Sequence, residues 1–318
     1  MTSQEQRLQR QVWQDRAFRG ATLFFALLVL FALVGIIISL VLGSMPSIKA
    51  FGFNFLISGE WNPVTETFGG LNSVKGTVLT SLIAMLIGVP VSLGIAIFLT
   101  ELSPVWLRRP LGVAIELLAG VPSIIYGMWG LFVFAPWFSD NIQPWLMQKT
   151  ENIPAIGWLF QGPPMGIGLF TAGLILSIMV IPFISSVMRD VFEIVPHMIK
   201  ESAYGLGGTT WEVVWNVVLP YTKNGVVGGI MLGLGRALGE TMAVTFVIGN
   251  SHTAVATLFD PATSIAATLA NEFTEAVGVL HTSALIELGL LLFLITFVVL
   301  ALSKLLLLQL QRGEGVHS

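Results

Sequence analysis

Two oppositely charged side chains lie within an otherwise apolar stretch and have the clearest capacity for chemistry in this sequence. Arg236 and Glu240 are the only charged residues between positions 225 and 249. If that stretch crosses a membrane, Arg236 lies deep within it, roughly 20 Å along a helix from Lys223 at about 1.5 Å per residue. A charge at such a depth is expensive and is usually functional. Because a guanidinium matches the geometry of a phosphate group, we expect Arg236 to donate hydrogen bonds to a passing oxyanion.

Glu240 follows Arg236 by four residues, so the two side chains share one face of a predicted helix and can pair. In the functional interpretation, Glu240 holds the arginine and balances its charge, and the neighbouring Thr241 lies on the same translocation path. The alternative is an ion pair within the helix that only locks packing. Glycines permit close contact between helices, and those that precede Glu240 here are Gly225, Gly228, Gly229, Gly233, Gly235 and Gly239. We therefore expect this helix to pack against neighbours or to line a path.

Several other kinds of chemistry have no support in the sequence. It contains no cysteine, which excludes disulfides and thiolate sites. No two of its histidines lie three to five residues apart, so we interpret them as isolated and expect no metal site; they are His197, His252, His281 and His317. No P-loop motif for binding ATP occurs. We therefore expect no cofactor on this chain and no enzyme activity of its own, and energy must come from a partner or from an ion gradient.

The composition indicates an integral membrane protein. Of the 318 residues, 54% are hydrophobic and only 10% are charged, whereas a soluble domain carries about 25% charged residues. Soluble enzymes, nucleic-acid-binding proteins and disordered proteins are therefore poor matches. Open sheets cannot satisfy their backbone in lipid, and a crossing helix needs about 20 apolar residues. We predict an all-α protein with six transmembrane helices, near 20–43 (an anchor), 76–100, 111–135, 165–187, 225–249 and 283–306.

The basic residues set the expected orientation, because they concentrate on the cytoplasmic side of membrane proteins. With the segment 1–19 inside, the inner face holds Arg7, Arg10, Arg16, Arg19, Arg108, Arg109, Arg189, Lys200, Lys223, Lys304 and Arg312. The outer segments then hold only Lys49, Lys75 and Lys149. Both termini, including the tail 307–318, are expected in the cytoplasm. The outer loops 44–73 and 136–164 are rich in aromatic residues, which suits either the membrane interface or an external partner.

The longest inner loop has a pattern of two short helices. Pro196 suits the first turn of a helix, and Gly207 with Gly208 ends that helix. Thr209 and Glu212 then have the spacing of a capping box that begins a second helix, which Pro220 closes. The sequence therefore predicts a helix, a glycine turn and a second helix between 196 and 220.

The same loop carries a family resemblance. Glu201-Ser202-Ala203, then Gly207, then Val217, Leu219 and Pro220 resemble the "EAA" loop of ABC importer permeases, with serine and valine as mild departures. In that family the loop is the coupling helix that inserts into a groove on the ATPase subunit. The resemblance thus assigns coupling to the ATPase to Glu201, Ser202, Ala203, Gly207, Leu219 and Pro220.

Other segments resemble the phosphate-specific members of this family, of the PstC type. They include the runs 76–102, 109–130 and 233–244, and the outer run 55–63 with its Trp61-Asn62-Pro63. The resemblance covers nearly all of 31–304, whereas the outer loop 250–280 has nothing remarkable in it.

The resemblance implies a type I ABC importer (MetI-like) permease fold with its core over 74–306. It also implies uptake of inorganic phosphate from the periplasm, through a path shared with a second permease in a heterodimer. The implied partners are an ATPase dimer, which binds the ATP and Mg²⁺, and a periplasmic phosphate-binding protein. The implied location is the bacterial inner membrane. Two alternatives stay open: a permease for another oxyanion such as phosphonate or molybdate, and a secondary transporter or channel that works alone.

Overall fold

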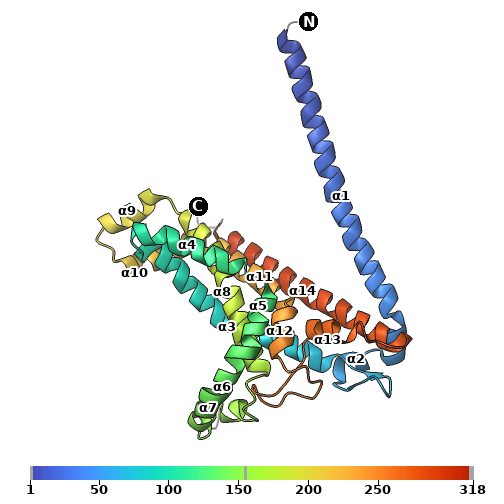
Figure 1. Ribbon diagram of the computed structural model, residues 1–318. Helices are drawn as coiled ribbons and strands as arrows, with labels where there is room; N and C mark the ends of the chain where they lie inside the picture. The colour runs from blue at the N-terminus through green and yellow to red at the C-terminus, as the bar shows by residue number, and fades with distance from the viewer. Residues whose placement is uncertain (1–2, 154–155, 315–318) are drawn as a thin grey trace.

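The computed structural model describes residues 3–153 and 156–314, and these are mostly helical (Figure 1). Five of their helices are long and apolar enough to cross a membrane, or six if one sharply bent pair counts as a span. The all-α membrane architecture is thus confirmed. The longer helices are α1 (Ser3–Phe51), α3 (Leu71–Ile97), α8 (Leu169–Glu193), α11 (Leu219–Leu238) and α14 (Val279–Glu314).

The third expected span is broken. Instead of one helix over 111–135, the chain forms α4 (Val105–Ala119) and α5 (Ser123–Trp129), and the segments on the two sides of the break meet at 87°. Pro122, the residue before α5, is extended with ψ 136° and cannot donate a backbone hydrogen bond. Proline also disfavours the helical conformation of the residue before it. The Gly120–Pro122 segment therefore ends one helix and starts another in a new direction.

After α5 the chain passes to the side of the molecule that the basic residues predict to be outer, which is called the outer side below. The short elements there are η2 (Gly130–Phe134), α6 (Ala135–Asn141), α7 (Gln143–Thr150) and η3 (Gly157–Phe160). In Figure 1 α6 and α7 project from the helical body at the end opposite to α9 and α10. The other outer loop contains α2 (Asn54–Ile57) and an antiparallel hairpin of β1 (Trp61–Asn62) and β2 (Thr67–Phe68).

The fifth expected span is also interrupted. The helix over 225–249 begins earlier, at Leu219, and stops at Leu238, after which α12 covers only Met242–Val247. Gly239 is the residue that ends α11, as glycine does at many helix ends. The break places Glu240 outside the helix that carries Arg236.

The first helix extends well beyond the expected anchor. It runs for 49 residues, to Phe51, so the predicted outer loop at 44 begins inside it. Near that end it is fixed to α14, since Ser283 Oγ accepts from the Ser47 backbone at 2.9 Å and donates to the Gly43 carbonyl at 2.9 Å. Most of the rest of α1 is exposed and projects away from the body of the protein (Figure 1).

The core forms where α3 and α11 pack against α8. Ile175, Leu176, Met179 and Ile184 of α8 are at most 2% exposed. Three glycines spaced four residues apart on α11 let that helix approach α8 closely, which is a small-residue pattern typical of membrane helices. A Cβ on Gly225, Gly229 or Gly233 would meet Val191, Val187 or Ile184, respectively. The expectation that these glycines permit a close helix contact is therefore confirmed.

Replacing Gly233 with valine is expected to destabilise this contact. A Cβ there would clash with the Cδ1 and Cγ1 atoms of Ile184, which is fully buried. Overpacking of this kind costs about 1–3 kcal/mol. Gly228→Val is the matched control, because a Cβ there meets nothing within 4 Å. Thermal unfolding of the purified protein in detergent should show a lower midpoint for Gly233→Val only, and equal midpoints for the two variants would contradict the packing argument.

Candidate functional site: inner coupling surface, mid-span arginine and outer carboxylate cluster

The inner loop folds as a short helical projection. Helix α9 (His197–Gly205) follows Pro196, and α10 (Thr210–Val213) follows a turn in which Gly207 has φ +88°. The Thr209 backbone N–H donates to the Glu212 carboxylate at 2.8 Å, and the Glu212 N–H donates to the Thr209 hydroxyl at 3.4 Å. The predicted helix, glycine turn and capping box are thus confirmed.

The end of this projection differs from the expectation. Pro220 does not close a helix but lies in the first turn of α11, and helical conformation runs through it from Thr210 to Leu238. Between α10 and α11 the chain forms a π-helical segment, η4 (Val214–Val218). Leu219, next to Pro220, packs against the hydrophobic core. A displacement of the projection can therefore reach α11 through continuous helical backbone.

The projection exposes side chains that a soluble surface would normally bury. Met198 is 78% exposed, Leu206 91% and Trp211 68%. Glu201 and Ser202 are exposed beside them, whereas Ala203 faces inward and packs on the core. In Figure 1 α9 and α10 lie together at the edge of the molecule, beyond the ends of the long helices. This combination of apolar and polar exposed residues can dock into a groove of another protein.

The mid-span arginine has no carboxylate partner among the described residues. Arg236 lies in the last turn of α11, with its guanidinium carbon 5.4 Å from the centre of the Phe183 ring, and its Nε atom is buried without a hydrogen bond. The expected pair with Glu240 is not formed. Glu240 lies in the break after α11, and its Oε1 accepts from the Ala243 N–H at 3.2 Å.

The pairing prediction failed because it assumed a continuous helix. With the helix broken at Gly239, the four-residue spacing no longer places Arg236 and Glu240 on one face. Thr241 keeps its position at the break, where its carbonyl accepts from the Thr245 hydroxyl at 2.7 Å. Arg236, Glu240 and Thr241 thus lie around the break. The buried Nε–H of Arg236 makes no hydrogen bond and could donate to an anion.

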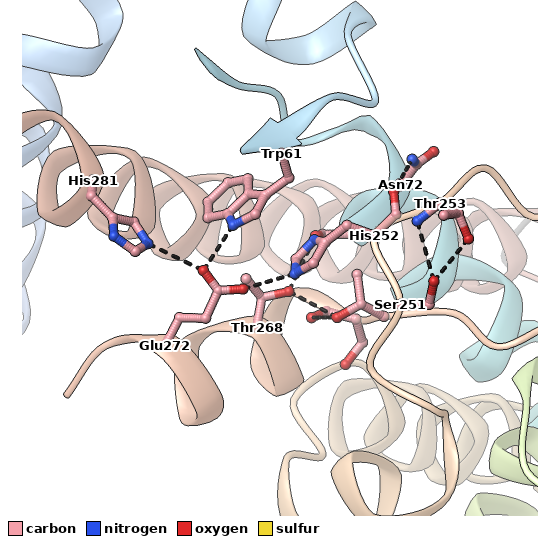
Figure 2. Close-up of polar contacts among 11 residues, drawn as sticks. Trp61, Asn72, Ser251, His252, Thr253, Thr268, Glu272 and His281 are labelled. Carbon is pink, nitrogen blue, oxygen red and sulfur yellow. Dashed lines mark hydrogen bonds and ion pairs between the residues drawn. The ribbon is translucent and has the colours of Figure 1, made fainter. Parts of the chain in front are cut away.

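The outer face contains a cluster that sequence reasoning missed. The carboxylate of Glu272, at the end of α13 (Ile265–Glu272), lies within hydrogen-bonding distance of three ring nitrogens (Figure 2). One carboxylate oxygen lies 2.7 Å from His252 Nε2, and the other lies 2.7 Å from Trp61 Nε1 and 3.1 Å from His281 Nε2. The Trp61 and His252 rings stack at 5.4 Å, and Phe68 stacks on His281 at 5.1 Å.

This cluster corrects two expectations. The two histidines are not isolated, and the outer loop over 250–280 is not unremarkable, because it supplies both His252 and Glu272. The interacting residues come from the hairpin, the loop after α12, α13 and α14, and Trp61 lies 211 residues from Glu272. No local spacing could reveal the cluster. It holds four segments of the outer face together, and the described residues include no group of three or more side chains suited to a metal ion.

The cluster predicts a pH-dependent contribution to stability. Burial raises the pKa of Glu272, but the hydrogen bonds from His252, Trp61 and His281 outweigh it and hold that pKa below its usual value. A lowered folded pKa means that the contribution is present above the unfolded pKa of about 4.3 and is lost as pH falls through the folded pKa.

Glu272→Gln should therefore lower stability at pH 7, by about 1–3 kcal/mol, since glutamine leaves one of the ring donors unmatched. The loss should shrink as pH falls below about 4. Glu275→Gln, at an exposed position three residues on, serves as the control. Thermal unfolding across this pH range measures both, and a Glu272→Gln deficit that stays constant down to low pH would contradict the assignment.

Similarity to known proteins identifies the family of this chain. The sequence profile described as "Binding-protein-dependent transport system inner membrane component" matches residues 88–311, which is more than half of the chain. The chain belongs to this family of transport permeases. It is therefore a multi-pass membrane permease of the ABC transporter class.

Curated relatives confirm the resemblance to PstC-type permeases. A Pasteurella multocida protein named "Phosphate transport system permease protein PstC" is 62% identical over 94% of this chain and 93% of its own length. The protein of the same name from Haemophilus influenzae is 57% identical over 99% of this chain and 100% of its own length. A Mycobacterium tuberculosis relative, PstC 1, is 37% identical over 85% of this chain.

Solved structures agree on the fold of this permease. A crystal structure of a bacterial ABC transporter involved in the import of the polysaccharide alginate matches 95% of this chain and 99% of that chain, with a TM-score of 0.59 at 15% identity. An inward-facing MetNI methionine transporter matches 75% of this chain with a TM-score of 0.50. At these identities the likeness concerns the fold alone, and it confirms the MetI-like permease architecture.

Proposed function

We propose that this permease is one subunit of an ATP-driven importer that moves inorganic phosphate from the periplasm to the cytoplasm. The observation that carries the proposal is the 62% identity, over nearly the full length, to a phosphate transport system permease. Arg236 supports it, because it is half-buried and has no carboxylate partner among the described residues, and a guanidinium in a narrow path attracts an oxyanion and excludes cations.

In this proposal the path runs past the break between α11 and α12. Arg236 offers donors to phosphate, and Glu240 and Thr241 shape the break that exposes them. Glu240 Oε1 already accepts the Ala243 N–H, so it stabilises the start of α12 rather than neutralising the arginine. Helices interrupted at a site are the usual way in which membrane transporters expose backbone and polar groups to a substrate.

The inner projection is the proposed contact with the ATPase subunits, which bind ATP and Mg²⁺. Glu201, Ser202 and Ala203 lie on α9, and Gly207 sets the angle between α9 and α10. Leu219 and Pro220 begin α11, so a movement imposed on the projection reaches Arg236 along a single helix. The exposed Met198, Leu206 and Trp211 supply the apolar surface that such a contact needs.

The remaining partners are a second permease and a periplasmic phosphate-binding protein. Apolar side chains of α1 such as Val29 (66% exposed) and Leu42 (64% exposed) find no cover within this chain and suit either lipid or the second permease. The binding protein would dock on the outer hairpin and the α6–α7 projection. Both termini lie in the cytoplasm in this arrangement, and the membrane is the bacterial inner membrane.

Uptake of labelled phosphate tests the proposal in a strain that lacks its own permease and expresses this chain with its partner subunits. We expect saturable uptake that arsenate inhibits and phosphonate does not. Uptake inhibited mainly by phosphonate or molybdate would favour the other oxyanions. A partner ATPase with an inactivated P-loop should abolish uptake, and full uptake without ATP hydrolysis would instead indicate a carrier that works alone.

A further inference from the structure

A largely buried ion pair joins the inner projection to the end of α3. Lys200 of α9 and Glu101 are 99 residues apart in sequence, and the Lys200 Nζ atom lies 2.5 Å from Glu101 Oε1. Their side chains are only 12% and 6% exposed, respectively. Buried charges are retained when they are paired, because removing one partner leaves the other uncompensated. The pair is therefore a specific link and not a loose surface contact.

The local backbone presents Glu101 for this contact. After Ile97 the α-helix α3 changes to a π-helical segment, η1 (Phe98–Leu102), and Glu101 lies in that widened turn. Such π-helical turns are uncommon and occur often at functional positions. The turn is itself well fixed, since Leu99 and Thr100 are buried and the buried Ser103 hydroxyl donates to the Leu99 carbonyl at 3.1 Å. Glu101 is thus a rigid partner for Lys200.

Helix α9, in contrast, has little else to hold it. None of its residues is fully buried, its main packing partners are α10 and η4, and Ala203 packs against the core. The Lys200–Glu101 pair connects α9 to η1, which continues α3, and α3 packs extensively against α8 in the core. A force applied to α9 can therefore reach the transmembrane helices by two routes, through η4 to α11 and through the ion pair to α3.

We propose that Lys200 and Glu101 are positioning residues that transmit movement of α9 to α3, so that ATP hydrolysis at the partner subunits stays coupled to opening of the path. The inference rests on the proposed function and deepens it. It assigns a second mechanical connection, separate from the residues of the inner loop that resemble the family motif.

The experiment uses the complete complex in proteoliposomes and measures phosphate taken up per ATP hydrolysed. Glu101→Gln and Lys200→Met should each lower this ratio at least about 10-fold, while the complex still assembles and hydrolyses ATP. The double variant should be no worse than either single variant, because the two residues act through one contact. Glu193→Gln, which removes an exposed negative charge from the same inner face, should leave the ratio unchanged.

A covalent bridge gives a positive test, because the chain contains no cysteine of its own. In the variant Glu101→Cys/Lys200→Cys, with cysteine-free partners, a short thiol cross-linker should restore the ratio that the uncross-linked variant has lost. A fluorophore on Leu86→Cys, an exposed position of α3, reports ATP-driven movement without depending on the substrate. Wild-type movement without phosphate uptake would contradict the proposed function alone. Unchanged ratios in Glu101→Gln, or loss of assembly in both single variants, would overturn the role proposed for the ion pair.

Discussion

Replacing Arg236 with glutamine should reduce phosphate uptake by the assembled complex at least about 100-fold. Hydrogen bonds to a charged partner contribute about 1.5–3 kcal/mol each, and about 1.4 kcal/mol corresponds to a tenfold change. Glutamine keeps a donor but removes the positive charge and the fork of a guanidinium. Arg236→Lys keeps the charge without the fork and should retain part of the uptake. Initial rates of labelled phosphate uptake, at equal amounts of assembled complex, measure the effect.

The alternative, in which Arg236 only locks packing, has a different signature. If it held, Arg236→Gln would lower the thermal midpoint or prevent assembly, and an assembled variant would transport normally. Glu240→Gln separates the two interpretations further. Because Glu240 accepts from Ala243 and forms no pair with Arg236, its neutralisation should have a smaller effect on uptake than Arg236→Gln. Equal losses in the two variants would contradict the geometry described above.

Gly207→Asp should uncouple ATP hydrolysis from phosphate uptake. Gly207 has φ +88°, a left-handed conformation that costs most residues with a side chain about 1–2 kcal/mol and costs aspartate somewhat less. There is open space around the position, so a side chain strains the backbone without a steric clash. The strain is expected to change the angle between α9 and α10, and thereby the fit of the projection to the ATPase. We expect uptake to fall at least about 10-fold while the ATPase remains active.

Gly205→Asp is the matched control for this variant. It introduces the same charge two residues away, at a position where a Cβ also meets nothing within 4 Å and the backbone φ is not positive. Uptake and ATP hydrolysis are compared in the same preparation. If both glycine variants lose coupling equally, the charge and not the turn is responsible, and normal coupling in Gly207→Asp would exclude any role for the turn.

Sequence reasoning was most successful where a pattern is local. Long apolar runs predicted helices that the structure contains as α1, α3, α8 and α14, because burial in lipid depends on hydropathy alone. The inner projection was also predictable, since Thr209 and Glu212 form a capping box whose spacing is fixed by the helix itself.

Breaks in the helices were harder to predict. Hydropathy does not change where a helix changes direction, so the apolar pattern predicts continuous spans across both the bend at Pro122 and the end of α11 at Gly239. The misplaced pairing of Arg236 with Glu240 followed from that error. Proline and glycine were visible in the sequence, but both also occur within intact membrane helices, as Pro90 does in α3.

Long-range contacts were beyond the reach of a single sequence. Glu272 is bonded to residues between nine and 211 positions away, and Lys200 to a residue 99 positions away. Nothing in the local spacing of a histidine or a lysine indicates such a partner. Both sets of contacts form only when distant segments pack together, so they depend on the three-dimensional arrangement of the helices.

The most direct test of the central claim is phosphate accumulation in proteoliposomes that contain this permease, its second permease and its ATPase subunits. With the phosphate-binding protein outside and ATP on the side of the inner projection, labelled phosphate should accumulate against its gradient and should stop when ATP is replaced by a non-hydrolysable analogue. Accumulation that needs only an ion gradient, or transport of another oxyanion with phosphate excluded, would contradict the account.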